Sequence, residues 1–174
     1  MLGNFTLNSF FWKMVKNLFL VRHAEAIKSG PGEKDFDREL TANGVHEASK
    51  IGRKLFEKGI KIDMLVSSNA IRSASTAQLI AEQIKFNTSQ ILFEKDVYEA
   101  SVRSLLNLIN ETEDRIQQLM IVGHNPVMSY LTEYLTGGQI DGFPAGGVAA
   151  IELSGSWKEV TGSGGRMIFF EMPS

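Results

Sequence analysis

An arginine and a histidine, Arg22 and His23, directly follow the apolar residues 18–21. A short apolar run of this kind is suited to a buried strand, so the pair would be presented where a strand ends. A guanidinium group binds phosphate oxygens through two parallel hydrogen bonds, and a neutral imidazole nitrogen is a nucleophile toward phosphorus. The pair is therefore a candidate for chemistry on a phosphoryl group. An Arg-His pair after an apolar run also arises by chance, so the other strand ends must decide.

Three more residues of suitable chemistry follow the later apolar runs. Arg72 lies in the first turn of the helix predicted after the second run, Glu99 follows the third run, and His124 ends the fourth. Ligands of open α/β sheets bind outside the carboxyl ends of the strands. Each of these residues alone would be interpreted as a surface or capping residue. Together they predict an anion-binding active site with two arginines, two histidines and a carboxylate.

Predicted helix starts add to this edge of the sheet. Thr41 is a plausible N-cap for the helix that follows it, and residues 67–69 are capping residues for the next one. Asn125 as N-cap with Pro126 at the first helical position predicts another helix start. The helix N-termini at Asn69 and Pro126 supply backbone N–H donors and a favourable dipole for the same anion.

The elements that must position these residues alternate between strand and helix, and two strands close the chain. This order predicts a three-layer α/β/α sandwich with a largely parallel sheet and antiparallel C-terminal strands. A length of 174 residues fits one domain, which we place at residues 17–174 after an N-terminal extension of residues 1–16. The predicted strands are residues 18–21, 60–66, 91–93, 118–122, 148–153 and 167–171.

Composition excludes several classes of function. The net charge is −2, with 18 basic and 20 acidic side chains, so nothing favours nucleic-acid or membrane-surface binding. The chain has no cysteine, which excludes cysteine-nucleophile phosphatases, disulfide frameworks and zinc sites that contain cysteine. With only three histidines a His-rich metal centre is not expected either, and we expect neither a metal nor a cofactor.

The first residues allow several interpretations. The apolar stretch of residues 10–21 is interrupted by Lys13 and Lys16 and is too short to span a membrane. A signal peptide would remove the Arg-His pair, so we expect a cytoplasmic protein. Met14 is an alternative start, and the aromatic residues before it would then pack on the domain or mediate self-association.

Four sequence blocks resemble one known family. Residues 20–25, Leu-Val-Arg-His-Ala-Glu, resemble the Arg-His-Gly motif of the histidine phosphatase (phosphoglycerate mutase-like) superfamily, with Ala24 in place of the usual glycine. Residues 40–48 resemble its Leu-Thr-x-x-Gly-x-x-x-Ala segment, and residues 67–77 its Ser-Ser-x-x-x-Arg-x-x-x-Thr-Ala block. Residues 122–125 resemble its second-histidine motif. The blocks occur in the family's order, and the resemblance implies a phosphoglycerate mutase-like fold.

Further segments resemble the small SixA-like branch of phosphohistidine phosphatases within this family. Residues 35–41 resemble its Asp-x-x-Arg-Pro-Leu-Thr segment, with Glu39 at the proline position, and residues 98–101 and 124–126 also match. The short connection of residues 100–116 leaves no room for the large substrate-binding insertions of phosphoglycerate mutases and phytases. This implies an open site that suits a phosphohistidine on a protein surface.

The resemblance assigns roles to the candidate residues. It implies that His23 is the nucleophile and forms a phosphohistidine intermediate that water later hydrolyses. Arg22, Arg72 and His124 would bind the equatorial phosphoryl oxygens. For catalysis His23 must be neutral, and a protonated His124 would be favoured beside the phosphate.

The proton donor is less well defined. Glu99 matches the region where related phosphomonoesterases place their acid, and Glu25 and Asp37 are alternatives. The main hypothesis is a metal-independent phosphohistidine phosphatase that acts on a phosphorylated protein. The alternatives are a phosphatase of small phosphoesters from the same superfamily and, from another class, a non-catalytic module that binds a phosphorylated partner.

Overall fold

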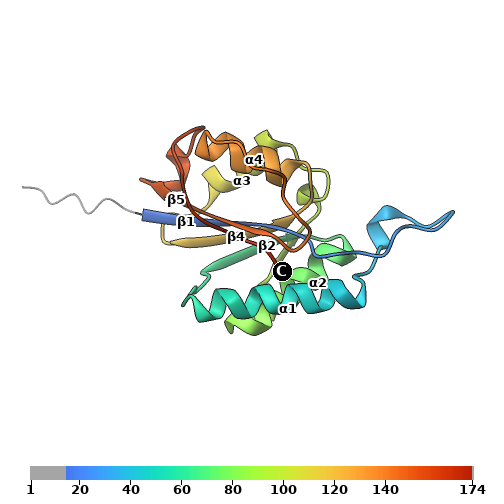
Figure 1. Ribbon diagram of the computed structural model, residues 1–174. Coiled ribbons are helices and arrows are strands. Elements are labelled where there is room, and N and C mark those ends of the chain that lie inside the picture. The colour runs from blue at the N-terminus through green and yellow to red at the C-terminus, as the bar shows by residue number, and fades with distance from the viewer. Residues whose placement is uncertain (1–14, 174) are drawn as a thin grey trace, which may run out of the picture.

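A six-stranded mixed sheet forms the middle of the molecule in the computed structural model, which describes residues 15–173 (Figure 1). Its strand order is β3-β2-β4-β1-β5-β6. The first four strands of this order are parallel, whereas β5 and β6 are antiparallel. The predicted sheet is thereby confirmed. The strands are β1 (Val15–Arg22), β2 (Met64–Ser68), β3 (Leu92–Glu94), β4 (Gln118–Gly123), β5 (Val148–Ser154) and β6 (Arg166–Glu171).

Helices cover both faces of this sheet, as the sequence predicts. Figure 1 shows α1 and α2 on one side of the strands and α3 and α4 on the other. The helices are α1 (Ala42–Glu57), α2 (Ile71–Ile84), α3 (Val102–Glu111) and α4 (Val127–Thr136). Among residues 15–173 no helix is long and apolar enough to cross a membrane.

Alternating side chains of β1 build the two halves of the core. Leu18 and Leu20 belong to the apolar cluster under α3 and α4, whereas Phe19 and Val21 belong to the cluster under α1 and α2. Successive side chains of a strand point to opposite faces of the sheet. A strand with both faces covered therefore has a continuous apolar sequence, as residues 18–21 do.

β1 starts at Val15, two residues before the domain start expected at residue 17. Lys16 is fully buried in this strand, and its ammonium group donates hydrogen bonds to the backbone carbonyls of Asp114 and Ile116. The ammonium group also lies 5.8 Å from the ring centroid of Trp157. These contacts provide the partners that a buried cation requires. The hypotheses on residues 1–13 lie outside the described residues.

One helix start follows the prediction and another does not. Thr41 caps α1, because its hydroxyl oxygen accepts a hydrogen bond from the amide of Gly44 at 2.9 Å. The prediction for α4 is wrong: the helix begins at Val127, and its N-cap, Pro126, makes no side-chain hydrogen bond. The side-chain amide of Asn125 donates to the carbonyl of Phe143 at 3.1 Å instead. A contact distant in sequence therefore replaces the local cap.

The helix that carries Arg72 is also capped differently. α2 has Ala70 at its N-cap position, and the Ala70 amide donates to the hydroxyl of Ser68 at 3.2 Å. No side chain caps this helix, because the Ser68 hydroxyl accepts from the amide of the N-cap residue itself and Asn69 has no capping role. This places Arg72 in the first turn of the helix, directly above the carboxyl end of the sheet.

Candidate active site

Strand pairing brings the two candidate histidines together. β1 and β4 are parallel neighbours, with Arg22 opposite Gly123, so His23 and His124 follow paired positions. Their ring centroids are 5.2 Å apart. Two imidazoles that lie 101 positions apart in sequence thus meet at the carboxyl edge of the sheet, where the sequence predicts the site.

Arg72 lies between these two rings and is almost fully buried, with 4% of its surface exposed. Its Nε donates a hydrogen bond to Nε2 of His23 at 3.2 Å. Its Nη2 lies 3.3 Å from Nδ1 of His124. One guanidinium group therefore contacts both imidazoles.

The hydrogen bonds of His23 define its tautomer. Its Nδ1 lies 2.8 Å from the backbone carbonyl oxygen of Ala24, which can only accept a hydrogen bond. Nδ1 therefore carries the proton, and Nε2 keeps its lone pair on the side of Arg72. A neutral imidazole held in this tautomer has the electron pair that attack on phosphorus requires.

His124 is held in the opposite tautomer by two serines that sequence reasoning missed as site residues. Its Nε2 lies 2.8 Å from the hydroxyl of Ser68 and 3.3 Å from that of Ser73. Because Nδ1 accepts from Arg72, Nε2 is the protonated nitrogen. Ser68 is the second serine of the Ser-Ser-x-x-x-Arg block, which was the signal available in the sequence, whereas Ser73 follows the arginine at a position that the block does not specify.

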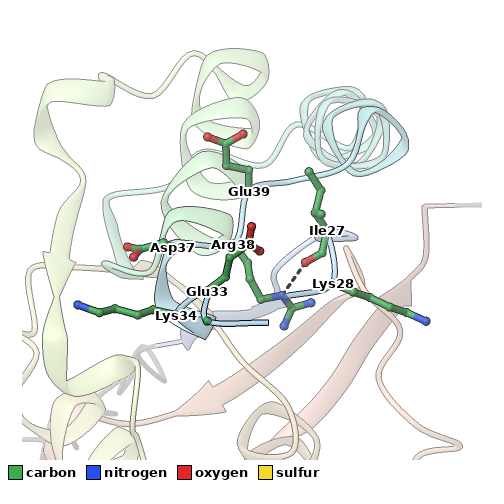
Figure 2. Close-up of a pocket in the computed structure, with 8 residues that line it drawn as sticks. Ile27, Lys28, Glu33, Lys34, Asp37, Arg38 and Glu39 are labelled. Carbon is green, nitrogen blue, oxygen red and sulfur yellow. Dashed lines mark hydrogen bonds between the residues drawn. The ribbon is translucent and has the colours of Figure 1, made fainter. Parts of the chain in front are cut away.

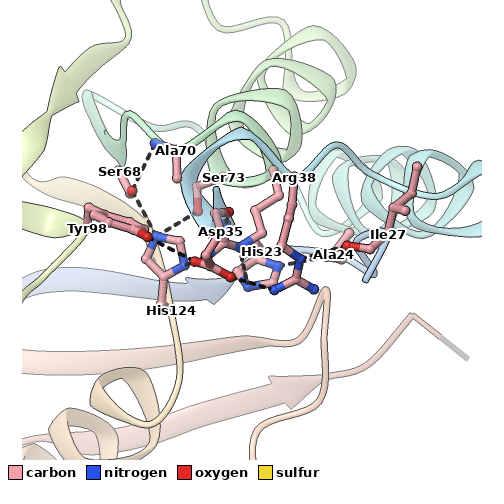
Figure 3. A network of polar contacts seen from close by, with 11 residues as sticks. His23, Ala24, Ile27, Asp35, Arg38, Ser68, Ala70, Ser73, Tyr98 and His124 are labelled. Carbon is pink, nitrogen blue, oxygen red and sulfur yellow. Dashed lines mark hydrogen bonds and ion pairs between the residues drawn. The ribbon is translucent and has the colours of Figure 1, made fainter. Parts of the chain in front are cut away.

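Asp35 and Tyr98 also belong to the site, and neither was among the predicted site residues (Figure 3). Oδ2 of Asp35 accepts hydrogen bonds from Nη2 of Arg72 at 2.8 Å and from the hydroxyl of Tyr98 at 2.9 Å. Oδ1 accepts from Nη1 of Arg38 at 2.9 Å. These donors, led by Arg38, hold the pKa of the Asp35 carboxyl well below its usual range. Asp35 is therefore an anion at neutral pH.

Arg22 is partly buried at the end of β1. Its Nη1 donates to the carbonyl of Phe143 at 2.7 Å. Its Nε is buried without a hydrogen-bond partner among the described residues. A buried donor without a partner raises the free energy of the folded chain, and an anionic oxygen at this position would satisfy it.

The predicted proton donors lie outside this network in the described part of the chain. Glu99 is exposed in the turn next to Tyr98, and Asp37 is exposed beside Arg38. The carboxylate of Glu25 accepts a hydrogen bond from the side chain of Asn43 at 2.6 Å. The structure thus brings together Arg22, His23, Arg72 and His124, and leaves Glu99 exposed outside their hydrogen-bond network.

Ala24, which stands where the family usually has glycine, does not narrow the site. Its side chain is fully buried in a small apolar cluster with Leu40 and Ala48. Its backbone amide donates to the hydroxyl of Thr76 at 3.0 Å. The extra methyl group therefore fills the contact between the end of β1 and α1.

Burial and nearby cations keep both histidines neutral. Burial lowers the pKa of His23 to about 4, with further lowering by Arg72, Arg22 and Arg38. Burial also lowers the pKa of His124 to about 3, and the neighbouring His23 adds to this effect. The expected protonated His124 is therefore not the state of this arrangement. A phosphate dianion would add negative charge beside His124 and favour its protonation.

These shifts predict that both imidazoles stay neutral between pH 8 and about pH 5. Each folded-state pKa lies below the unfolded value, so the unfolded chain binds more protons over the interval between them. The stability from both groups is therefore complete above the unfolded pKa and is lost as the pH falls from about 6.5 toward about 4 for His23 and about 3 for His124. Nitrogen chemical shifts of the imidazoles, measured against pH, test this, and a midpoint near 6.5 for either ring would contradict it.

The strand order and the paired histidines define an α/β protein of the phosphoglycerate mutase-like fold. Residues 18–115 match the sequence profile of the Histidine phosphatase superfamily (branch 1). The chain belongs to this superfamily and to its SixA-like branch. Among residues 15–173 no group of three or more His, Asp or Glu side chains is arranged to hold a metal ion.

Two solved structures and one group of relatives illustrate this placement. The protein assigned as phosphohistidine phosphatase SixA from Agrobacterium tumefaciens is 30% identical, with a TM-score of 0.79, and the match covers 91% of this chain and 98% of that one. A tungstate complex of the protein histidine phosphatase SixA shares the fold, with a TM-score of 0.75 at 20% identity over 90% and 97% of the two chains.

The curated relatives include a serine/threonine-protein phosphatase Pgam5, mitochondrial, from Drosophila yakuba. It is 27% identical over 146 residues, which cover 68% of this chain and 50% of that protein. The chain spans half or less of the length of the first Pgam5 relatives that it matches.

Proposed function

We propose that this protein is a phosphohistidine phosphatase that removes phosphate from a histidine on a partner protein. The observation that carries the proposal is Arg72, which contacts the lone pair of His23 Nε2 and also reaches His124. A nucleophile beside a guanidinium group is the arrangement that phosphoryl transfer needs. The similarity to the SixA structure from Agrobacterium tumefaciens supports phosphohistidine as the substrate class.

The openness of the site supports a protein substrate. The chain between Tyr98 and β4 contains only α3 and short turns, so this connection holds no long insertion that could cover the site. None of residues 25–39, which form the other side of the site, is buried. A site without such an insertion admits a phosphorylated side chain that stays attached to its protein.

The proposed reaction has two displacement steps at phosphorus. In the first, His23 Nε2 forms a bond to phosphorus while the bond between phosphorus and the substrate imidazole breaks, and that imidazole leaves as a neutral group because its other ring nitrogen already carries a proton. In the second, water attacks phospho-His23, releases inorganic phosphate and restores the neutral imidazole. Arg22, Arg72 and His124 stabilise the charge on the three equatorial oxygens in both steps. No step requires a metal ion.

Glu99 is the proposed proton donor for ester substrates. Its exposed carboxyl group lies one residue from Tyr98, which borders the site. Asp35 is a poor donor because its neighbours hold it in the ionised form. A substrate imidazole that is already protonated leaves without a donor, whereas an alkoxide or phenolate leaving group gains from one.

The Glu99→Gln variant is therefore expected to separate two substrates. Its rate on a phosphohistidine-bearing protein stays near that of the wild type, whereas hydrolysis of an alkyl phosphomonoester falls by about 10²-fold. Initial rates of phosphate release on both substrates, with and without a chelator, provide the measurement. The chelator is expected to change neither rate. Glu94→Gln, which removes another exposed carboxylate before the same turn, is the matched control.

Other outcomes would point elsewhere. Equal losses on both substrates would contradict the leaving-group argument. Wild-type activity on the ester but none on the phosphoprotein would favour the alternative, a phosphatase of small phosphoesters. Inhibition by the chelator would contradict metal-free chemistry.

A further inference from the structure

The carboxylate of Asp35 binds the guanidinium group of Arg72, which is also the group proposed to bind the phosphoryl oxygens. Nη2 of Arg72 donates to Oδ2 of Asp35, and Nη1 donates to the backbone carbonyl of the same residue at 2.6 Å. Nε is directed at His23 and Nη2 also at His124. Four of the five N–H donors of this guanidinium group are thus engaged by the protein itself.

A phosphoryl group cannot accept two parallel hydrogen bonds from Arg72 while its guanidinium group donates to Asp35 and the two histidines. Carboxylate and phosphoryl oxygens bind the same guanidinium geometry, so they compete for the same donors. The hydroxyl of Tyr98 and Nη1 of Arg38 also point at the Asp35 carboxylate, which therefore has three side-chain donors around it. These three donors resemble an anion-binding site that is occupied by a carboxylate of the protein itself.

The segment that carries Asp35 is built so that it can be displaced. Residues 25–39, which we name the arm, project beyond the rest of the domain (the light-blue segment in Figure 1), and none of them is buried. Its returning limb is tied to the domain by the bonds of Asp35 and by an edge contact between the rings of Phe36 and Tyr98, with centroids 5.3 Å apart. Contacts of this kind, without buried apolar side chains, are the ones that open locally.

The arm also encloses a hollow that Arg38 helps to line (Figure 2). The hollow has a volume of about 480 Å³ and is lined by Ile27, Lys34, Arg38 and other residues of the arm alone. Within it Nε of Arg38 donates to the carbonyl of Ile27 at 2.6 Å, so Arg38 joins the two limbs of the arm. Arg38 therefore moves with the arm, whereas Arg72 stays with α2.

We propose that Asp35 is an internal anion that blocks the phosphoryl position on Arg72 and that the substrate displaces it as the arm opens. This inference rests on the proposed function, because it assigns the same site to the phosphoryl group. It makes Asp35 a residue that lowers the affinity of the site for any tetrahedral oxyanion. Arg72 exchanges one anion for another and is never left without a partner of opposite charge.

The competing interpretation is that Asp35 only positions Arg72. The two interpretations predict opposite changes in the affinity of the site for an oxyanion when the Asp35 carboxylate is removed. A blocking anion lowers the apparent affinity by the fraction of time for which the site is open, so its removal strengthens binding. A positioning carboxylate keeps the guanidinium group in place, so its removal weakens binding.

Calorimetric titration with tungstate, a tetrahedral dianion, distinguishes an increase in affinity from a decrease. The full chain is compared with Asp35→Asn, Asp35→Ala and, as a matched control, Glu39→Gln, which removes an exposed carboxylate elsewhere on the arm. We expect both Asp35 variants to bind tungstate about tenfold more tightly than the wild type, and the control to bind as the wild type does. Asp35 is half-exposed, with 51% of its side chain accessible, so both variants are expected to fold, and thermal unfolding verifies this.

The remaining outcomes are informative as well. Weaker or unchanged binding in folded Asp35 variants would overturn the inference and leave the proposed phosphatase function intact. An equal gain in tungstate affinity in Glu39→Gln would also overturn it, since the net negative charge of the arm would then be the cause. Absence of tungstate binding in every variant would overturn both proposals. If the Asp35 variants bound tungstate more tightly but the wild type hydrolysed no phosphohistidine, the internal anion would be supported and the proposed substrate would be rejected.

Discussion

The His23→Asn variant is expected to lose phosphohistidine phosphatase activity by a factor of about 10³ or more, because His23 supplies the nitrogen lone pair that forms the bond to phosphorus. His23 Nε2 keeps its lone pair since Nδ1 donates to the Ala24 carbonyl. The wild type is also expected to form a covalent phosphoenzyme. Its phosphoramidate bond is stable in alkali and is hydrolysed in acid. Single-turnover labelling with a radioactive phosphohistidine protein, followed by denaturation in alkali, measures this intermediate.

His46→Asn is the matched control for this experiment. His46 is exposed on α1 and has no contact with the site, so its replacement is expected to leave both the rate and the labelling unchanged. If His23→Asn retained the wild-type rate, the nucleophile would be another residue. Label that remained in the His23 variant would identify that residue by mass spectrometry.

The Arg72→Lys variant is expected to lower kcat/KM by about 10²- to 10³-fold, although it preserves the charge. Arg72 contacts His23 through Nε and His124 through Nη2, and these nitrogens are held in one plane. A lysine ammonium group is a point charge that cannot reproduce this geometry. Steady-state kinetics on the phosphohistidine protein, together with thermal unfolding, separate a loss of catalysis from a loss of stability.

Arg53→Lys on the exposed side of α1 provides the control, and its kinetic constants are expected to match those of the wild type. We expect the Arg72 variant to lose kcat as well as affinity, because the guanidinium group acts on charge that develops in the transition state. A change in KM alone would mean that Arg72 contributes binding energy equally to the ground state and the transition state. The role proposed for it in stabilising the transition state would then be wrong.

The four central residues of the site were accessible to sequence reasoning for a definite reason. Arg22, His23 and His124 follow apolar runs directly, and the ends of parallel strands meet at one edge of the sheet whatever the strand order is. Arg72 was accessible because it opens a helix after such a strand. Local pattern and sheet geometry together are sufficient for residues of this type.

Asp35 and Tyr98 were not accessible in the same way. Asp35 lies in a loop without periodic pattern, and its bond to Arg72 joins residues 37 positions apart. Apolar periodicity does not indicate which exposed carboxylate will fold back onto a cation, and the only local signal was that Asp35 opens the segment of residues 35–41 that resembles the SixA-like branch. For the same reason the sequence indicated Asn125 as a helix cap, whereas its amide reaches Phe143 instead.

By itself the sequence determined the order of strands and helices, the residues presented at the strand ends and the family to which they belong. Apolar periodicity and motif spacing are local properties, and they survive in any correct fold of the chain. The tertiary structure alone decided the tautomers of His23 and His124, their neutral state and the closure of Arg72 by Asp35. These depend on burial and on hydrogen bonds between distant segments, which exist only after the sheet has assembled.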